Sequence, residues 1–178
     1  ARQQLLFVDR KLAKATELPG PTGESNTLYL EARGNLACVR CEHTSLRFWL
    51  ISIVSALATG NCVLATTDPI FENDANVIAQ LLSDSGLPAG VFSVGTLAHL
   101  PTILSDDNLA GAVVDRASYL KNLIGQQIAA RKGAILPTIV AHDDHSLFYR
   151  LVTEKTVTID TTAAGGNASL MTMEANVG

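Results

Sequence analysis

The sequence predicts an α/β fold: a Rossmann-like open, mainly parallel sheet with helices on both faces, plus an N-terminal extension and a C-terminal β-flap. Two observations lead to this prediction. Short, almost continuously apolar segments alternate with longer segments whose apolar residues recur every three or four positions. The expected strands are apolar almost without interruption, which is typical of a parallel sheet covered on both faces. The 178 residues are 47% hydrophobic and only 17% charged, so we also expect part of the surface to be covered in a larger assembly.

Five apolar segments after Arg33-Gly34 are the expected strands of this sheet: residues 36–39, 62–66, 90–94, 111–114 and 135–141. A helix should follow the first strand, because apolar residues recur there at helical spacing: Leu46, Trp49, Leu50, Ile53 and Leu57. Gly60-Asn61 should end that helix. In the next helix, Asp68 is expected to act as the cap and Pro69 to take the first position.

The remaining helices have weaker signals. Gly86 should end the helix that follows Pro69, and residues 96–105 are expected to form a short helix. A further helix has a buried stripe that consists of Leu120, Leu123, Ile124 and Ile128. One more short helix is expected at residues 145–152.

The two ends of the chain are predicted to lie outside this sheet. Residues 2–15 are expected to be helical, and residues 156–160 to form a strand, followed by an extended segment at 162–173. We therefore divide the chain into an N-terminal helix and connector (1–33), a Rossmann-like domain (34–153) and a C-terminal β-flap and tail (154–178).

Composition excludes several classes of protein. With 13 Lys and Arg against 17 Asp and Glu, the net charge is −4, so we expect no nucleic-acid binding. Three cysteines cannot supply a disulfide framework. The uncharged runs at residues 48–67 and 86–105 are interrupted by Gly, Asn or Pro, so we expect no transmembrane segment and a cytoplasmic location.

Dinucleotide binding in such a fold needs glycines where the strands lead into helices. The turn after the first strand, residues 40–44, has no glycine and contains Glu42. The turn after the second strand contains Asp68, and residues 115–118 again lack glycine. These turns predict no cofactor-binding residue.

The cysteine and histidine residues are candidates for a metal or catalytic site. Cys38 is expected in the core, whereas Cys41 can be exposed, although its neighbour Glu42 disfavours a thiolate. The segment His142-Asp143-Asp144-His145 can be read as a metal or acid–base site or as a solvated loop capped by Asp144 or Ser146. No other His or Cys completes a site by its spacing, so we predict neither catalytic nor metal-binding residues.

Several segments carry a family resemblance. Residues 20–27 and 151–173, the latter containing Thr162-Ala163-Ala164-Gly165-Gly166-Asn167-Ala168-Ser169, resemble the proline utilization A (PutA) proteins. Residues 33–61, 86–91 and 126–137 look like the nucleotide-binding half of an aldehyde dehydrogenase. The resemblance spans nearly the whole chain.

The departures from the active enzymes are informative. By ungapped counting, the oxyanion Asn of the active enzymes falls at His43, and the Lys that contacts the cofactor ribose falls at Thr66. The Phe-Thr-Gly-Ser turn falls at residues 114–117, and the catalytic Glu falls at Ala141. The lobe with the nucleophilic Cys is absent. Thioester chemistry needs all of these groups together, so the resemblance implies a noncatalytic, C-terminal aldehyde-dehydrogenase-like domain.

The resemblance also implies a parent protein. The family joins an FAD-dependent proline dehydrogenase to an NAD-dependent L-glutamate γ-semialdehyde dehydrogenase by a channel for the intermediate. The parent would carry FAD and NAD, whereas this fragment would carry no cofactor and be inactive alone. Some family members are peripheral on the inner face of the bacterial membrane.

This domain would pack on the catalytic domains of the same polypeptide, and its tail would help to cover the channel. Small and polar residues suit a close interface. The residues expected to form it are Thr161, Thr162, Gly165, Gly166, Asn167, Ser169, Leu170 and Met171. An alternative is that the flap only completes the domain's own sheet.

Two further hypotheses remain open. One is a residual nucleotide- or metal-binding regulatory module that uses His43 or the loop at 142–145. The other is homo-oligomerisation through the C-terminal flap, which the resemblance also allows, because aldehyde dehydrogenases use the corresponding hairpin in this way.

Overall fold

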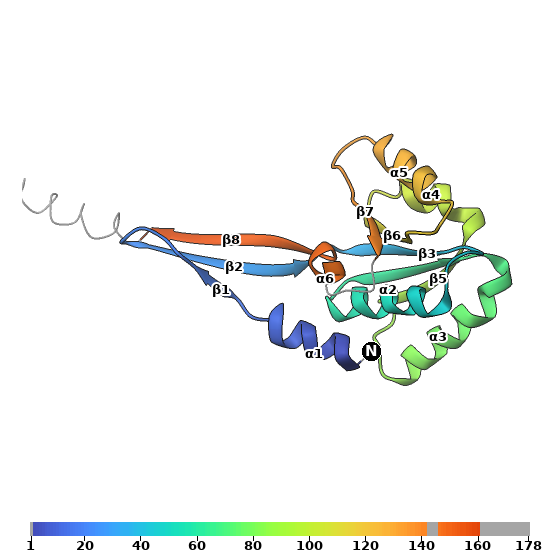
Figure 1. The fold of residues 1–178 in the computed structure, drawn as a ribbon, viewed down its shortest axis with the longest axis horizontal. Helices are drawn as coiled ribbons and strands as arrows, with labels where there is room; N and C mark the ends of the chain where they lie inside the picture. The colour runs from blue at the N-terminus through green and yellow to red at the C-terminus, as the bar shows by residue number, and fades with distance from the viewer. Residues whose placement is uncertain (1, 142–145, 161–178) are drawn as a thin grey trace, which may run out of the picture.

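The computed structural model describes residues 2–141 and 146–160 (Figure 1). A body of strands and helices carries a long antiparallel ribbon that projects from one end. The elements are α1 (Arg2–Lys11), β1 (Thr16–Leu18), β2 (Glu24–Ala32), β3 (Asn35–Arg40), α2 (Leu46–Ala58), β4 (Cys62–Thr67), η1 (Pro69–Phe71), α3 (Glu72–Asp84), β5 (Phe92–Thr96), η2 (Leu97–His99), α4 (Leu100–Ser105), β6 (Leu109–Asp115), α5 (Lys121–Ala129), β7 (Thr138–Ala141), α6 (Ser146–Arg150) and β8 (Val152–Asp160).

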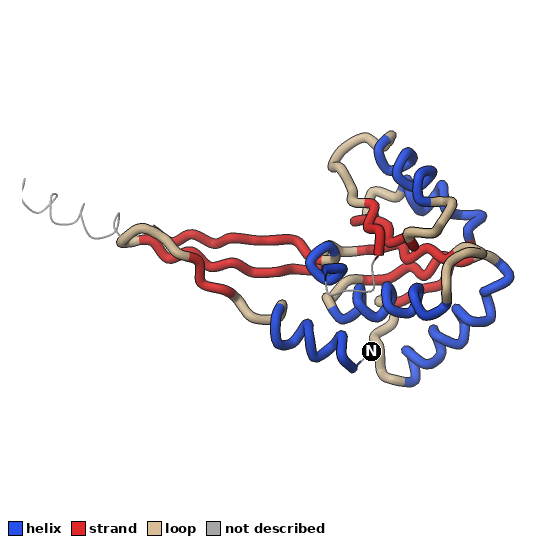
Figure 2. The backbone as a smooth tube through the Cα atoms, viewed as in Figure 1, coloured by secondary structure: helices blue, strands red, loops and turns tan. Residues whose placement is uncertain are grey.

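The body contains a five-stranded parallel sheet in the order β5-β4-β3-β6-β7. The first strand of this sheet along the chain, β3, is central. β4 and β5 follow on one side of it, and β6 and β7 then follow on the other side. This is the doubly wound order, and its switch point lies between β3 and β6. The predicted fold class is confirmed, including the parallel sheet with helices on both faces (Figure 2).

Alternation along β3 creates two cores, because successive side chains point to opposite faces of a strand. Leu36 and Cys38 belong to the core that includes Trp49 of α2. Ala37 and Val39 belong to the second core, which includes Ile124 of α5. Cys38 is fully buried, as predicted.

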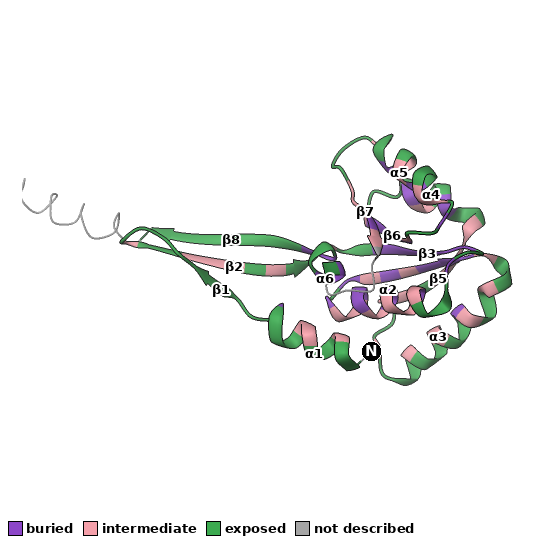
Figure 3. Ribbon diagram, viewed as in Figure 1, coloured by how far each residue is buried: buried purple, intermediate pink, exposed green. Residues whose placement is uncertain are grey.

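The ribbon pairs two strands from the N-terminal region with one strand that follows the parallel sheet in the sequence. β2 pairs with β8 over nine residues, from Glu24 opposite Asp160 to Ala32 opposite Val152, and β1 adds a short third strand. Both faces of the ribbon are largely exposed (Figure 3). The segment predicted to be extended, residues 162–173, lies outside the described residues.

Several element boundaries differ from the prediction. α1 ends at Lys11 rather than at residue 15, and β8 starts at Val152 rather than at residue 156. β5 starts at Phe92 rather than at residue 90, because Gly90 has a φ of +85° and lies in the preceding turn. β7 starts at Thr138, and Ile135, expected in that strand, is 96% exposed.

Helix-level predictions also needed correction. Asp68 makes no side-chain capping bond, because Pro69 opens a 3-10 turn that moves the start of α3 to Glu72. Leu46 and Leu123, expected on buried stripes, are 40% and 44% exposed. No helix in the described part of the chain combines the length and apolarity that a bilayer crossing requires.

Candidate functional site

The carboxyl ends of β3 and β6 border the switch point, where open α/β sheets bind their ligands. Two loops meet there: residues 41–45 after β3, and residues 116–120 after β6. The side chains that these loops place over the sheet decide what the crevice can hold.

The two loops contact each other directly. Cys41 Sγ lies 3.2 Å from Ser118 Oγ and 3.5 Å from Thr44 Oγ1. All three residues are buried. The expectation that Cys41 can be exposed is wrong, because the loop folds back on itself: Thr44 N donates to Cys41 O at 2.8 Å, and Cys41 N donates to Thr44 Oγ1.

A second contact spans the same two loops. The ring of His43 meets the ring of Tyr119 edge-on, with 6.3 Å between centroids. Together with the Cys41–Ser118 contact, it joins the loops across the switch point.

We call the carboxyl ends of the parallel strands, together with the loops at 41–45 and 116–120, the crest. Arg40, the last residue of β3, fills the part of the crest next to these loops. Its side chain is 6% exposed, and its Nη1 atom lies 2.7 Å from Asp74 Oδ2 on α3. The guanidinium carbon stands 3.7 Å from the centroid of Phe71 and 5.4 Å from that of Trp49. Trp49 is fixed in turn, because its Nε1 donates to Cys38 O at 2.9 Å.

The end of β4 supplies no charged group to the crest. Thr66 is fully buried, and its Oγ1 atom has no hydrogen-bond partner among the described residues. Asp68 N donates to Arg40 O at 3.2 Å, which holds the turn after β4 against β3. Arg40, Cys41 and Ser118 are thus buried and packed at the base of these loops.

The described residues at and below the crest offer little for nucleophilic or metal chemistry. Cys38 lies in the core beneath the crest. Burial raises the pKa of Cys38 from 9.0 to about 12, so this thiol stays protonated and is a poor nucleophile at neutral pH. Among residues 2–141 and 146–160, no group of three His, Cys, Asp or Glu is placed to hold a metal ion. The segment His142–His145 and the predicted tail interface lie outside the described residues.

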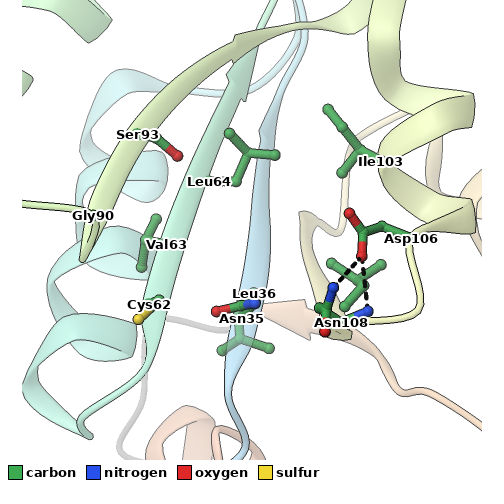
Figure 4. A pocket seen from close by; sticks show the side chains of 11 residues that line it. Asn35, Leu36, Cys62, Val63, Leu64, Gly90, Ser93, Ile103, Asp106 and Asn108 are labelled. Atoms are coloured by element: carbon green, nitrogen blue, oxygen red, sulfur yellow. Dashed lines mark hydrogen bonds between the residues drawn. The ribbon is translucent and has the colours of Figure 1, made fainter.

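A separate hollow of about 250 Å³ lies at the opposite ends of the strands (Figure 4). Asn35, Cys62 and Leu109, the first residues of β3, β4 and β6, line it together with Ser93. Asp106 closes one side and accepts hydrogen bonds from the backbone N and the Nδ2 atom of Asn108. None of the residues at the switch point lines this hollow.

The sequence analysis did not predict the ion pair of Arg40 and Asp74. A single cation at the end of an apolar strand, as at Arg40, is nevertheless a usable signal for a buried ion pair. Its partner, Asp74, lies 34 positions away on α3, and no local pattern identifies it.

Comparison with known proteins places this geometry in a family, although no family model matches the chain. The chain is 30% identical over 158 residues to the bifunctional protein PutA of Salmonella typhimurium, covering 88% of this chain and 11% of that protein. It is 32% identical over 167 residues to the PutA protein of Rhizobium meliloti, covering 87% and 12%. The chain therefore spans only about a tenth of the length of the curated relatives it matches.

Solved structures agree with the sequence comparison. A crystal structure of a bifunctional proline utilization A (PutA) protein matches with a TM-score of 0.70 and 28% identity, over 78% of this chain and 14% of that chain. An NAD-dependent benzaldehyde dehydrogenase from Corynebacterium glutamicum matches with a TM-score of 0.60 and 20% identity, over 78% and 30%, which shows the fold alone. The chain is therefore homologous, over 88% of its length, to a segment of the bifunctional PutA proteins, and it has the α/β fold of aldehyde dehydrogenases.

Proposed function

We propose that this chain is a noncatalytic structural domain of a bifunctional PutA protein that converts proline to glutamate. The parent would use FAD in its proline dehydrogenase and NAD in its L-glutamate γ-semialdehyde dehydrogenase. Homology to the PutA proteins supports the proposal that the parent is a bifunctional PutA protein. The contact between the two loops at the switch point supports the noncatalytic role.

The residues at the crest do not fit a dinucleotide. A Rossmann fold binds pyrophosphate where the backbone of a glycine-containing turn and a helix N-terminus approach it closely. Here the Cys41–Ser118 contact at 3.2 Å joins the two loops that border that place, and Arg40 occupies the adjoining space with Asp74 and Phe71. This Cys41–Ser118 closure is the observation on which the proposal depends.

The ribbon supports the packing role. β8 carries the chain away from the body and ends at Asp160, opposite Glu24 at the far end of β2. The tail that follows would lie on the catalytic domains and cover the channel for the intermediate. The residues proposed for this cover are Thr161, Thr162, Gly165, Gly166, Asn167, Ser169, Leu170 and Met171.

Truncation of the parent protein tests this role. Ending the chain after Asp160 should leave proline oxidation unchanged and lengthen the lag before NADH appears, because intermediate escapes from an uncovered channel. Ending it after Met173 keeps all the residues proposed for the cover and serves as the matched control. A chemical trap for the free aldehyde should capture intermediate only from the shorter protein. Equal lags in the two truncated proteins would reject the role of the tail.

Homo-oligomerisation through the flap is the second candidate. β8 pairs only with β2 within the described residues and exposes Val157 and Ile159, so its other edge can add a strand from a second copy. Light scattering at several protein concentrations tests this function. An Ile159→Lys substitution should abolish the oligomer, whereas Leu123→Lys on α5 should not. A monomer at every concentration would reject this candidate.

A further inference from the structure

The parallel sheet is covered unevenly on its two faces. On the α2 side of β4, Val63 and Ala65 are buried in the first core. On the α4 side of the same strand, Cys62 and Leu64 are only half-buried, and Ser93, which lies opposite Leu64 in β5, is exposed. Helices normally cover both faces of a parallel sheet. The amino ends of β4 and β5 are therefore an exception on one face.

The position of α4 explains this gap. The helix has only six residues, and its two buried side chains, Leu100 and Leu104, pack in the core that includes residues of β3 and β6 but none of β4 or β5. The hollow of about 250 Å³ lies beside this helix, between β4, β5 and the loop that follows α4 (Figure 4). It is thus a consequence of how α4 is placed on the sheet.

Apolar side chains line part of the hollow. Leu64 from β4 and Ile103 from α4 line it from opposite sides in Figure 4. Gly95 leaves room for both of them, because a Cβ atom there would lie 3.3 Å from Leu64 Cδ1 and 3.7 Å from Ile103 Cδ1. Leu36 and Leu109 add further apolar surface. A molecule that binds here would therefore need an apolar body.

One carboxylate is held at the edge of the hollow. Asp106 Oδ1 accepts hydrogen bonds from Asn108 N at 2.8 Å and from Asn108 Nδ2 at 3.2 Å, as the dashed lines in Figure 4 show. Both bonds use the same oxygen, so the Oδ2 atom remains available to a ligand. The amide of Asn35 and the hydroxyl of Ser93 add neutral polar groups.

The charges around the hollow favour a cation. Asp106 is the only charged residue among the described residues that line it. Asn35 and Leu36 apart, the lining residues come from the segment 48–115, which contains no Lys or Arg. Arg131 contacts the loop after α4, but its Nη1 atom donates to backbone carbonyl oxygens, and the residue does not line the hollow. The hollow therefore disfavours an anionic group.

We propose that this hollow binds a small organic amine, a molecule with an apolar body and a single ammonium group and without a carboxylate. The ammonium group would lie against Asp106 Oδ2, and the body against Leu64 and Ile103. An apolar cavity of about 150 Å³ is enough for benzene, and pockets for drug-sized ligands measure about 300–1,000 Å³. A volume of about 250 Å³ therefore suits an amine with a single ring or a short chain. This site goes beyond the proposed structural role and does not depend on it.

Alkylation of Cys62 reports whether the hollow is occupied, because this half-buried thiol lines it, whereas Cys38 and Cys41 are buried. In the full-length parent protein, peptide mapping follows iodoacetamide labelling at Cys62 in the presence of cyclohexylamine, which is a cation at neutral pH. Labelling should slow saturably, with half-protection at an amine concentration on the order of 1 mM or below. Cyclohexanol, the neutral analogue, should protect at least about fivefold more weakly, and cyclohexanecarboxylate should not protect.

Three results of this experiment would overturn the proposal. The first is equal protection by cyclohexylamine and by either analogue, and the second is no protection by the amine. The third is a Cys62 thiol that reacts no faster than that of Cys38, because the hollow would then be closed in the full-length protein.

Two substitutions separate the effect of Asp106 from that of general negative charge. Asp106→Asn removes the charge but keeps an oxygen that can accept from Asn108, so half-protection should need about five- to tenfold more amine. Asp107→Asn removes a neighbouring exposed carboxylate that does not line the hollow, and it should leave protection unchanged. Equal effects of the two substitutions would overturn the assignment of Asp106.

Filling the hollow is an independent test. Ser93→Leu places a larger apolar side chain at an exposed position that lines the hollow, and it should abolish protection of Cys62 by the amine. Urea denaturation checks that the variant is folded. Protection that persists in the folded Ser93→Leu protein would mean that the amine binds elsewhere, and it would overturn the proposal.

Discussion

The Sγ atom of Cys41 lies 3.2 Å from the Oγ atom of Ser118, across the switch point of the parallel sheet. The two residues are 77 positions apart in the chain and belong to the loops after β3 and β6. In an open α/β sheet, a ligand sits between such loops. Here the two loops contact each other directly through buried side chains.

Removing the Ser118 hydroxyl should destabilise this closure. Ser118→Ala deletes the contact with Cys41 and the bond that Ser118 Oγ accepts from Leu120 N, with an expected loss of about 1–2 kcal/mol in the free energy of unfolding. Urea denaturation measures it. Ser105→Ala, which removes an exposed hydroxyl on α4, is the matched control. Equal losses would show that the closure contributes nothing specific.

The Arg40–Asp74 pair should contribute more than an exposed pair. Asp74→Asn leaves the buried guanidinium of Arg40 without its counter-charge and should lower the free energy of unfolding by about 1–2 kcal/mol. The loss is smaller than for a fully buried pair, because the Asp74 side chain is 41% exposed. Lys155→Met breaks the exposed pair with Glu31 and should cost at most about 0.5 kcal/mol. Urea denaturation of both variants compares them. Similar values for the two would contradict the assigned role of Arg40.

Asn61 should be the most sensitive polar residue of the body. Its Oδ1 accepts from Gly34 N at 3.0 Å, and its Nδ2 donates to Leu151 O at 2.9 Å, so it holds both points at which the ribbon leaves the body. Asn61→Ala should cost about 2–4 kcal/mol, because it leaves two backbone groups unsatisfied.

Hydrogen exchange provides a second measurement for the same variant, since the Gly34 amide should exchange faster once Asn61 is removed. Asn26→Ala, which breaks the bond with Thr158 within the ribbon, is the control and should leave that amide unchanged. Unaltered exchange at Gly34 in the Asn61→Ala protein would refute the role of Asn61 as the junction.

Stability at alkaline pH should depend on Cys38. Burial raises its pKa from 9.0 to about 12, so the thiol is protonated in the folded and unfolded states below pH 9. Between pH 9 and 12 the unfolded chain releases this proton more readily, and the free energy of unfolding falls as pH rises. Cys38→Ala should make that decline shallower by up to about 1.4 kcal/mol per pH unit.

Urea denaturation at several pH values from 8 to 10.5 measures this slope. Val63→Ala, which shortens a buried side chain that does not titrate, is the matched comparison and should keep the slope of the unmodified protein. Parallel curves for Cys38→Ala and the unmodified protein would mean that Cys38 does not titrate in the unfolded chain alone.

Much of the fold could be predicted from the sequence, because its sheet is buried on both faces. Segments such as residues 36–39 and 111–114 are apolar without interruption, and the helices between them have clear periodicity. The order of these elements, together with the rule for right-handed crossovers, leaves few possible topologies. The parallel sheet was therefore predicted correctly, with errors at element boundaries.

The ribbon and the crest could not be predicted in the same way. Alternation at residues 156–160 predicted one strand of the ribbon. Its pairing with β2 could not be predicted, because both strands are largely exposed and Glu31 and Lys155 meet across 124 positions. The crest depends on contacts such as Arg40–Asp74, between side chains on different elements. The glycine-free turns led to the expectation of no dinucleotide site, but they did not reveal which side chains lie at the strand ends.

Titration calorimetry of this chain with NAD tests the central claim most directly. The proposed noncatalytic role, in which Arg40, Cys41 and Ser118 take the place of a dinucleotide, predicts no saturable binding up to ligand concentrations on the order of 1 mM. An active NAD-dependent aldehyde dehydrogenase provides the positive control. Stoichiometric binding of NAD to this chain in the micromolar range, lost on Thr66→Arg, would contradict the account.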